Sequence, residues 1–168
     1  GLSPLLINTI TKSKWAFKKW GVIGDSITER NFRTNKNYHD YIAEKINCFV
    51  YNYGVSGTGW RTPNGAGTGR PIYERIGAMD PTLDLITVFA GTNDWGETGK
   101  PLVLGQFGDT DPAASFYGAV DNVFSQLIAK YPTKTIAVFT PLPRGDAFNG
   151  PNGSGITLEQ VADAIIKV

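Results

Sequence analysis

The chain has 168 residues, with 16 Lys and Arg against 15 Asp and Glu and a formal net charge of +1. Hydrophobic residues make up 41% and charged residues 18% of it, which is typical of one globular domain and not of a disordered chain. The scattered basic residues do not indicate nucleic-acid binding, and no stretch reaches the ~20 apolar residues of a membrane span. The single cysteine, Cys48, excludes an intrachain disulfide and a cysteine-based zinc site, and no side-chain spacing predicts a metal or another cofactor.

Residues 1–19 are predicted to form a lead-in segment ahead of one domain that spans residues 20–168. Four lysines lie close together at its end, in KSKWAFKKW (Lys12–Trp20), and such a basic stretch before a first strand is typically exposed to solvent. The sequence starts at Gly1 and shows no signal-peptide pattern. We therefore expect it to have been cut from a larger chain, which can itself belong to an assembly.

Short apolar runs rich in β-formers predict four strands, at Trp20–Gly24, Phe49–Tyr53, Leu85–Ala90 and Ile136–Thr140. The last three runs are nearly continuous, as expected for strands that are covered on both faces. Helical patterns lie between and after these runs, so strand and helix alternate. This order predicts an α/β sandwich around a mostly parallel sheet.

Three stretches predict the main helices. The first, NYHDYIAEKI, places Tyr38, Tyr41, Ile42 and Ile46 on one side. The second has Asp111 as a candidate N-cap and Pro112 at its first position, followed by an apolar stripe at spacings of three and four: Phe116, Val120, Val123, Leu127 and Tyr131. The third opens with Thr157 and Gln160 in capping-box positions.

The last helical pattern runs to Val168 without a stop signal. In an open α/β sheet, a helix at this point leads to another strand. We therefore expect a domain that is incomplete at its C-terminus, with a fifth strand beyond Val168, or a sheet that something else completes.

Polar segments of small residues follow the first three predicted strands: GDSIT with Ser26, NYGVSGTGW with Gly57 and FAGTNDW with Asn93. Because ligands of such sheets bind beyond the carboxyl ends of the strands, these segments predict one site. Each residue also has a structural interpretation. Ser26 can cap a following helix, Gly57 can be a turn glycine with positive φ, and Asn93 can be a turn or cap residue.

Ester hydrolysis would use all three residues. A serine hydroxyl that attacks an ester needs preorganised donors for the oxyanion. The backbone N–H of Ser26 near a helix N-terminus, the N–H of Gly57 and the amide of Asn93 are candidates. Trp60 and Trp95 follow two of these segments and are predicted to wall a pocket for a sugar or an acyl chain, together with Phe107 and Phe148; packing of the loops is the alternative.

With these three blocks in this order, nearly the whole chain resembles the SGNH hydrolases, also called GDSL esterases and lipases, from Gram-positive bacteria and their phages. The resemblance implies a flavodoxin-like three-layer α/β/α sandwich with a five-stranded parallel sheet, of which four strands are visible. It implies Ser26 as nucleophile and N–H donor, Gly57 as second donor, with Gly54 as the alternative, and Asn93 as third donor.

The family's fourth block, an Asp-x-x-His that supplies the general base, does not occur in this sequence. The only histidine, His39, lies on the first predicted helix, which carries it away from Ser26; we expect it to pack or to face solvent. Two explanations stay open. Either the parent protein continues past Val168 and supplies the block, or the protein has lost its base and uses the pocket for binding. In both cases the 168-residue chain itself is expected to be a poor esterase.

The resemblance thus implies a serine esterase that works through an acyl-enzyme. Short polar loops without a long hydrophobic lid favour a small acyl group, such as acetyl on a carbohydrate. The alternatives are a carbohydrate-binding or adhesion module of a phage tail or cell-surface protein, and a flavodoxin-like nucleotide binder, which the glycine-poor GDSIT disfavours. An extracellular, cell-surface or virion-associated location fits these functions.

Overall fold

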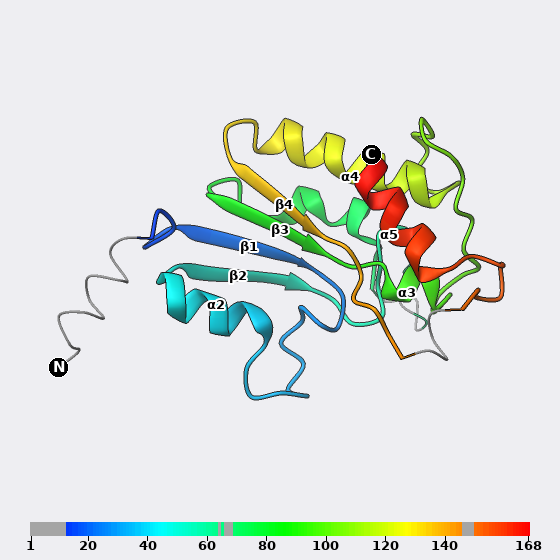
Figure 1. The fold of residues 1–168 in the computed structure, drawn as a ribbon. Helices are drawn as coiled ribbons and strands as arrows, with labels where there is room; N and C mark the ends of the chain where they lie inside the picture. Colours follow the sequence, from blue (N-terminus) through cyan, green and yellow to red (C-terminus); the bar gives the residue numbers. More distant parts are fainter. Residues whose placement is uncertain (1–12, 64, 66–68, 146–149) are drawn as a thin grey trace.

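The computed structural model describes residues 13–63, 65, 69–145 and 150–168, and shows a parallel sheet with helices on both faces (Figure 1). Its strands are β1 (Lys19–Gly24), β2 (Phe49–Gly54), β3 (Leu85–Phe89) and β4 (Thr135–Phe139), in the order β2-β1-β3-β4. All four predicted strands are confirmed. Because the strands run in parallel, their carboxyl ends share one edge of the sheet.

The inner and outer strands differ in burial. All of β3 is buried and so is β1 except for Lys19, whereas β2 and β4 are half-buried or exposed at every residue. The difference follows from the strand order, since β2 and β4 are edge strands. The expectation of cover on both faces is therefore right for β3 and wrong for β2 and β4.

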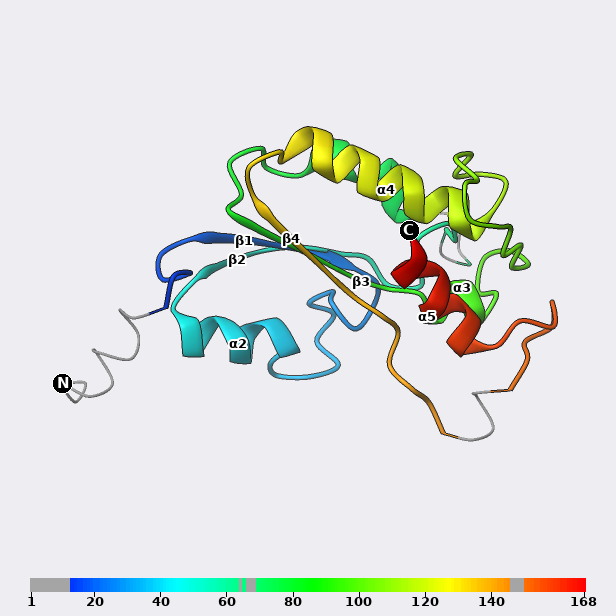
Figure 2. The ribbon, with the colours of Figure 1, turned by 45° about the horizontal axis from the view of Figure 1, so that its top comes forward.

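The helices surround this sheet unevenly. Helix α2 (Tyr38–Ile46) lies on one face, and α4 (Phe116–Lys130) lies on the other with the short 3₁₀ turns η1 (Ile72–Glu74) and η2 (Ile76–Ala78) (Figure 2). Helices α3 (Thr92–Trp95) and α5 (Leu158–Lys167) pack together near the carboxyl ends of the strands. This arrangement confirms the predicted α/β sandwich. Of the described helices, none is long and apolar enough to cross a membrane.

Two helices differ from the sequence-based expectation. Helix α4 begins behind Ser115, whose hydroxyl accepts the N–H of Gly118 at 3.0 Å; Asp111 instead starts a separate turn, in which its carbonyl accepts from Ala114 at 3.3 Å. On α2, Tyr41 and Ile42 are exposed and His39 is the buried residue, so the predicted apolar face is wrong there. The capping box of Thr157 and Gln160 on α5 is confirmed.

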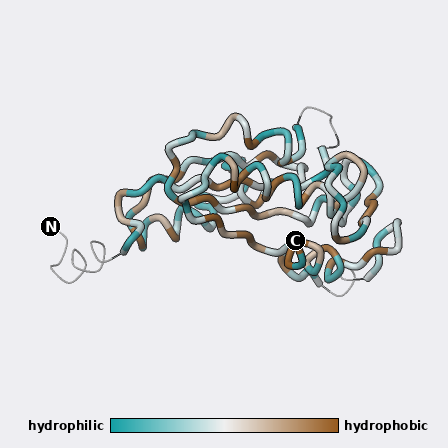
Figure 3. The backbone as a smooth tube through the Cα atoms, turned by 90° about the horizontal axis from the view of Figure 1, so that it is seen from above, coloured by the Kyte–Doolittle hydropathy of each residue, from teal (hydrophilic) through white to brown (hydrophobic). Residues whose placement is uncertain are grey.

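Most of the core lies between the sheet and the layer that holds α4. It includes Ile23, Ile86, Val120 and Leu127, and a smaller cluster of Trp20, Val22 and Leu85 lies under the other face. Figure 3 shows hydrophobic and hydrophilic residues mixed along α5, the helix that ends beside the C-terminus. Its Val161 and Ile165 are buried while Glu159 is exposed, as expected for an amphipathic surface helix.

Glycines end both β1 and β2, and they let the chain after β1 lie directly on the end of β2. Gly24 is paired with Gly54 in the parallel register. A Cβ atom on Gly54 would lie 2.3 Å from the backbone nitrogen of Glu29 and 2.6 Å from its Cα. A Cβ atom on Gly24 would lie 2.2 Å from the carbonyl oxygen of Phe89 on β3. No side chain fits at either place.

We predict that Gly54→Ala destabilises the fold by about 1–3 kcal/mol, because the added methyl meets backbone atoms that cannot rotate away. Gly77→Ala is the matched control, since a Cβ atom there has nothing within 4 Å. Denaturant unfolding of both variants measures the effect. Equal stability of the two variants would contradict the close approach at Gly54.

Candidate active site

A pocket of about 380 Å³ opens at the carboxyl edge of the sheet and contains two of the predicted site residues, Ser26 and Asn93. Segments that follow three different strands line it: Asp25, Ser26 and Ile27 after β1, Phe89, Ala90, Thr92 and Asn93 at the end of β3, and Pro141, Leu142, Pro143 and Arg144 after β4. The segments after β1 and β3 therefore meet here as the sequence predicts, whereas the segment after β2 does not line the pocket and a segment after β4, which the sequence reasoning missed, does.

Ser26 lies in a tight turn and not at the start of a helix. The carbonyl of Asp25 accepts the N–H groups of Thr28 at 3.1 Å and Glu29 at 2.9 Å, and its carboxylate accepts the N–H of Ile27 at 2.8 Å. The next helix, α2, begins only at Tyr38. The N-cap interpretation of Ser26 is thus wrong, because Asp25 closes the turn. The expected helix N-terminus, whose dipole would favour an oxyanion, is not present at Ser26 either. The half-buried Ser26 hydroxyl makes no hydrogen bond within the described residues.

Gly57 occupies a turn in which the N–H of Thr58 donates to the carbonyl of Val55 at 3.3 Å. Its φ is +77°, so the turn-glycine interpretation is right, and its own N–H has no acceptor in the described part of the chain. The N–H of Gly54, by contrast, donates to Oδ1 of Asn52 at 2.9 Å. Of the two candidate glycines, Gly57 is the one whose N–H is available, although it is not among the residues that line the pocket with Ser26.

The amide of Asn93 is held at both of its ends. Its Nδ2 donates to the carbonyl of Thr58 at 2.8 Å, and its Oδ1 accepts from the hydroxyl of Thr98 at 3.4 Å. The first bond ties α3 to the residue next to Gly57. It leaves one amide N–H of Asn93 without a partner among the described residues, as an oxyanion donor requires.

Asp94, the residue after Asn93, organises the loop that follows β2. It is fully buried, and its carboxylate accepts the backbone N–H groups of Trp60 at 2.9 Å, Arg61 at 3.0 Å and Thr62 at 3.1 Å. Burial raises the pKa of Asp94, and the hydrogen bonds from these N–H groups act in the opposite direction. A Cβ atom on Gly59 would lie 2.0 Å from Oδ2 of Asp94, which explains the glycine there. Sequence reasoning missed this role, although Asp94 stands inside the GTND motif.

Asn31 links the turn of Ser26 to the turn of Gly57. Its Nδ2 lies 2.9 Å from the carbonyl oxygen of Ser26 and 3.4 Å from the hydroxyl of Ser56. The Ser56 hydroxyl in turn donates to the carboxylate of Glu29. The two turns are therefore connected through side chains as well as through the sheet. No motif in the sequence marked Asn31.

The structure does not place Trp60 or Trp95 on the pocket wall. Trp60 is 0% exposed and its indole N–H donates to the carbonyl of Ala90 at 3.1 Å; Trp95 is 7% exposed and donates to the carbonyl of Ile156 at 3.1 Å. The prediction that these two side chains bind substrate is wrong, because each buries its ring and satisfies its N–H inside the fold. Phe107 is exposed away from the pocket, and Phe148 lies outside the described residues.

His39 is packed inside the fold, as one of the two alternatives predicted. It is 0% exposed, and its Nε2 lies 2.9 Å from both the carbonyl oxygen of Thr28 and Nδ2 of Asn52. It does not line the pocket that holds Ser26. No group of three potential metal ligands occurs among the described residues.

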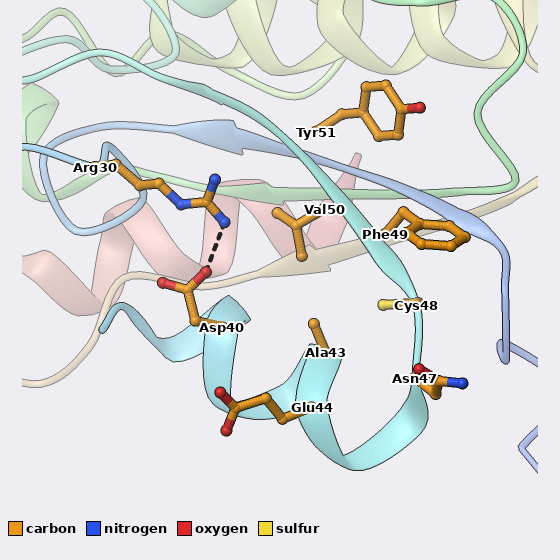
Figure 4. Close-up of a pocket in the computed structure, with 9 residues that line it drawn as sticks. All are labelled: Arg30, Asp40, Ala43, Glu44, Asn47, Cys48, Phe49, Val50 and Tyr51. Carbon is orange, nitrogen blue, oxygen red and sulfur yellow. Dashed lines mark hydrogen bonds and ion pairs between the residues drawn. The ribbon is translucent and has the colours of Figure 1, made fainter. Parts of the chain in front are cut away.

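A second cavity, of about 540 Å³, lies between α2 and β2 (Figure 4). Arg30 and Asp40 form an ion pair at 2.6 Å on its wall. The half-buried Cys48 is its only thiol, and burial raises the pKa of that thiol, which disfavours the reactive thiolate. Neither Ser26, Gly57 nor Asn93 lines this cavity.

Comparison with known proteins gives a family and a fold. The model of the GDSL-like lipase/acylhydrolase family matches residues 22–168. A Lactobacillus plantarum protein of known structure is 28% identical, with a TM-score of 0.76, over 90% of this chain and 71% of its own. A possible lipase from Chitinophaga pinensis is 27% identical, with a TM-score of 0.70, over 89% of this chain and 62% of its own. No curated protein sequence matched.

Further matches show the fold alone. An acetylxylan esterase from Geobacillus stearothermophilus, Axe2, is 17% identical, with a TM-score of 0.58, over 91% of this chain and 72% of its own. These matches agree with the four-stranded parallel sheet and the helices around it.

Next to Ser26, the carboxyl of Asp25 is 1% exposed, and its Oδ2 has no hydrogen-bond partner among the described residues. Burial raises the pKa of Asp25 to about 6; the charge of Asp94 acts in the same direction, while Arg75 opposes it. Between pH 4 and pH 6 the folded chain therefore binds a proton at Asp25 that the unfolded chain has released. This group makes the fold less stable as pH rises through that range.

We predict that Asp25→Asn removes this dependence. The free energy of unfolding of the variant minus that of the wild type should rise by about 2 kcal/mol between pH 4 and pH 6 and become level above about pH 7, since one pKa unit corresponds to ~1.4 kcal/mol. Denaturant unfolding at several pH values measures the difference. The other carboxyl groups are the same in both proteins, so their contributions to the pH dependence cancel. A difference that does not change with pH would refute the raised pKa.

Proposed function

The chain belongs to the GDSL-like lipase/acylhydrolase family, and on this premise we propose that it hydrolyses carboxylic esters with Ser26 as the nucleophile. The observation that carries the proposal is the position of Ser26, whose unbonded hydroxyl shares a pocket with the amide of Asn93. The N–H groups of Ser26 and Gly57 and the amide of Asn93 are the proposed oxyanion donors.

In the proposed reaction, the Ser26 oxygen attacks the acyl carbon and its proton passes to a base. The carbonyl oxygen becomes an oxyanion that the three donors stabilise, and the alcohol leaves with a proton. Water then attacks the acyl-enzyme, the acyl group leaves as the carboxylic acid, and the Ser26 oxygen regains a proton. Losing one such donor typically costs about 10²–10³ in rate.

The base is the part of this reaction that the described pocket does not supply. No histidine lines it, and His39 is packed against Thr28 and Asn52. We propose that the base of the whole protein lies outside these 168 residues. Without it, the oxyanion donors and binding alone would leave catalysis of about 10³–10⁴ over the reaction in water.

The proposed substrate is a small acyl ester, acetyl on a carbohydrate. The pocket has a volume of about 380 Å³ and is lined in part by the short segment Pro141–Pro143, and this modest size supports a small acyl group over a long chain. An acetylxylan esterase has the same fold, which is compatible with this substrate class. An extracellular, cell-surface or virion-associated location remains a prediction.

The second candidate function is a carbohydrate-binding or adhesion module on a scaffold that has lost catalysis. The observation in its favour is the absence of a histidine from the described pocket. Such a module would bind a sugar in this pocket and leave esters unchanged. Measured turnover therefore separates the two functions.

We predict that the chain accelerates the hydrolysis of 4-nitrophenyl acetate and that Ser26→Ala lowers this rate measurably, because the nucleophile is removed while the Gly57 and Asn93 donors stay in place. The matched control is Ser125→Ala, an exposed serine on α4 outside the pocket, which should keep the wild-type rate. Equal rates for Ser26→Ala and the wild type would contradict the serine mechanism and favour the binding module.

We also predict a preference for short acyl groups. The ratio kcat/KM for 4-nitrophenyl acetate should exceed that for the dodecanoate by at least about tenfold, because a pocket of about 380 Å³ has little room for a long chain. Initial rates with esters of increasing chain length measure the trend. A higher value for the dodecanoate would overturn the assignment of a small acyl group.

A further inference from the structure

Arg75, between η1 and η2, directs its guanidinium group to two backbone carbonyls at the ends of β1 and β2 and to a hydroxyl in the loop after β2. Its Nη1 donates to the carbonyl of Tyr53 at 2.6 Å, and its Nη2 lies 3.1 Å from the carbonyl oxygen of Gly24 and 3.0 Å from the hydroxyl of Thr58. Among the residues that the structure describes, no carboxylate is hydrogen-bonded to this guanidinium group. It thus uses its donors on chain segments and not on an ion pair.

The acceptors of Arg75 belong to the segments that carry the proposed catalytic groups. Gly24 is the last residue of β1, directly before the turn that holds Ser26. Tyr53 lies at the end of β2, and Thr58 follows Gly57. The carbonyl of the same Thr58 accepts the amide N–H of Asn93 at 2.8 Å. One side chain therefore connects all three blocks.

We propose that Arg75 is a positioning residue for ester hydrolysis, which holds the Ser26 turn, the Gly57 turn and, through Thr58, the Asn93 amide in one fixed geometry. This inference rests on the proposed function of the same pocket. Arg75 does not line that pocket, so its effect is exerted through the segments that it holds.

The position is unfavourable for an arginine in terms of stability alone. Its Nε is buried without a hydrogen-bond partner in the described chain, and an unmatched polar group of this kind costs free energy. Burial lowers the pKa of Arg75 to about 10, which Asp25 and Glu29 oppose, so the group is still charged at neutral pH. Two carbonyls and a hydroxyl in a fixed arrangement match the planar fork of arginine, whereas the ammonium of lysine is a point donor.

The test compares Arg75→Lys with Arg61→Lys on ester hydrolysis by the 168-residue chain. Arg61 is a matched control because it is at least as buried as Arg75 and also donates to backbone carbonyls, those of Ala113 at 3.1 Å and Pro101 at 3.0 Å, outside the pocket. We expect Arg75→Lys to lower kcat by about 10- to 100-fold with KM changed less than threefold, since small displacements of reacting groups have effects of this size. Arg61→Lys should leave both constants near those of the wild type.

A second variant and a second readout keep the test independent of folding and of turnover. Thr58→Val removes one acceptor of Arg75; combined with Arg75→Lys, it should lower kcat by less than the product of the single effects. In ¹⁵N NMR spectra, Arg75→Lys should shift the Gly57 amide and the Asn93 side-chain amide, which Arg61→Lys should leave in place.

The outcomes separate the two proposals. If the wild type hydrolyses esters and Arg75→Lys lowers kcat no more than Arg61→Lys, the positioning role is overturned and the esterase stands. If the wild type shows no turnover, the NMR shifts still decide the positioning role: unmoved Gly57 and Asn93 signals refute it. The positioning role would also be refuted if Arg75→Lys and Arg61→Lys lost kcat in the same proportion to their loss of melting temperature.

Discussion

A buried carboxylate joins the second and third strand ends of this molecule. Asp94 has no exposed surface and accepts three backbone N–H groups from Trp60, Arg61 and Thr62. A carboxylate in such a place is costly unless hydrogen bonds replace its water. If the loop after β2 moved away from α3, the buried carboxylate would lose these hydrogen bonds, and the fold would be destabilised. Because Asn93 is the neighbouring residue, its amide is held at a fixed place relative to the Gly57 turn.

The sheet and the position of the site followed from local patterns. Short β-rich runs bounded by glycine and polar residues predicted β1–β4 within a residue at each end. Polar segments after successive strands predicted where Ser26 and Asn93 would meet, since the carboxyl ends of parallel strands share an edge. These inferences succeeded because each depends on residues that are close together in the sequence.

Most of the errors came from contacts between distant residues. Trp60 and Trp95 were expected on the pocket wall, yet the carbonyls that bind their indole groups, those of Ala90 and Ile156, lie far away in the sequence. Ser26 does not cap a helix, because the carboxylate of the neighbouring Asp25 closes a turn there and α2 begins only at Tyr38. Arg75 was missed because no motif surrounds it in the sequence, and its role follows only from tertiary contacts.

The donors and the walls of the pocket are held in different ways. Asp94 and Arg75 fix the donor segments mainly through main-chain N–H and carbonyl groups, which every residue except proline offers in the same form. The walls consist of side chains such as Ile27 and Leu142, which are partly open to solvent. Evolution or design can therefore exchange the wall residues to change the ligand while the reactive geometry stays constant. Because the donor segments are held by main-chain contacts and the pocket wall is made of side chains, this scaffold is well suited to diversification of its substrates.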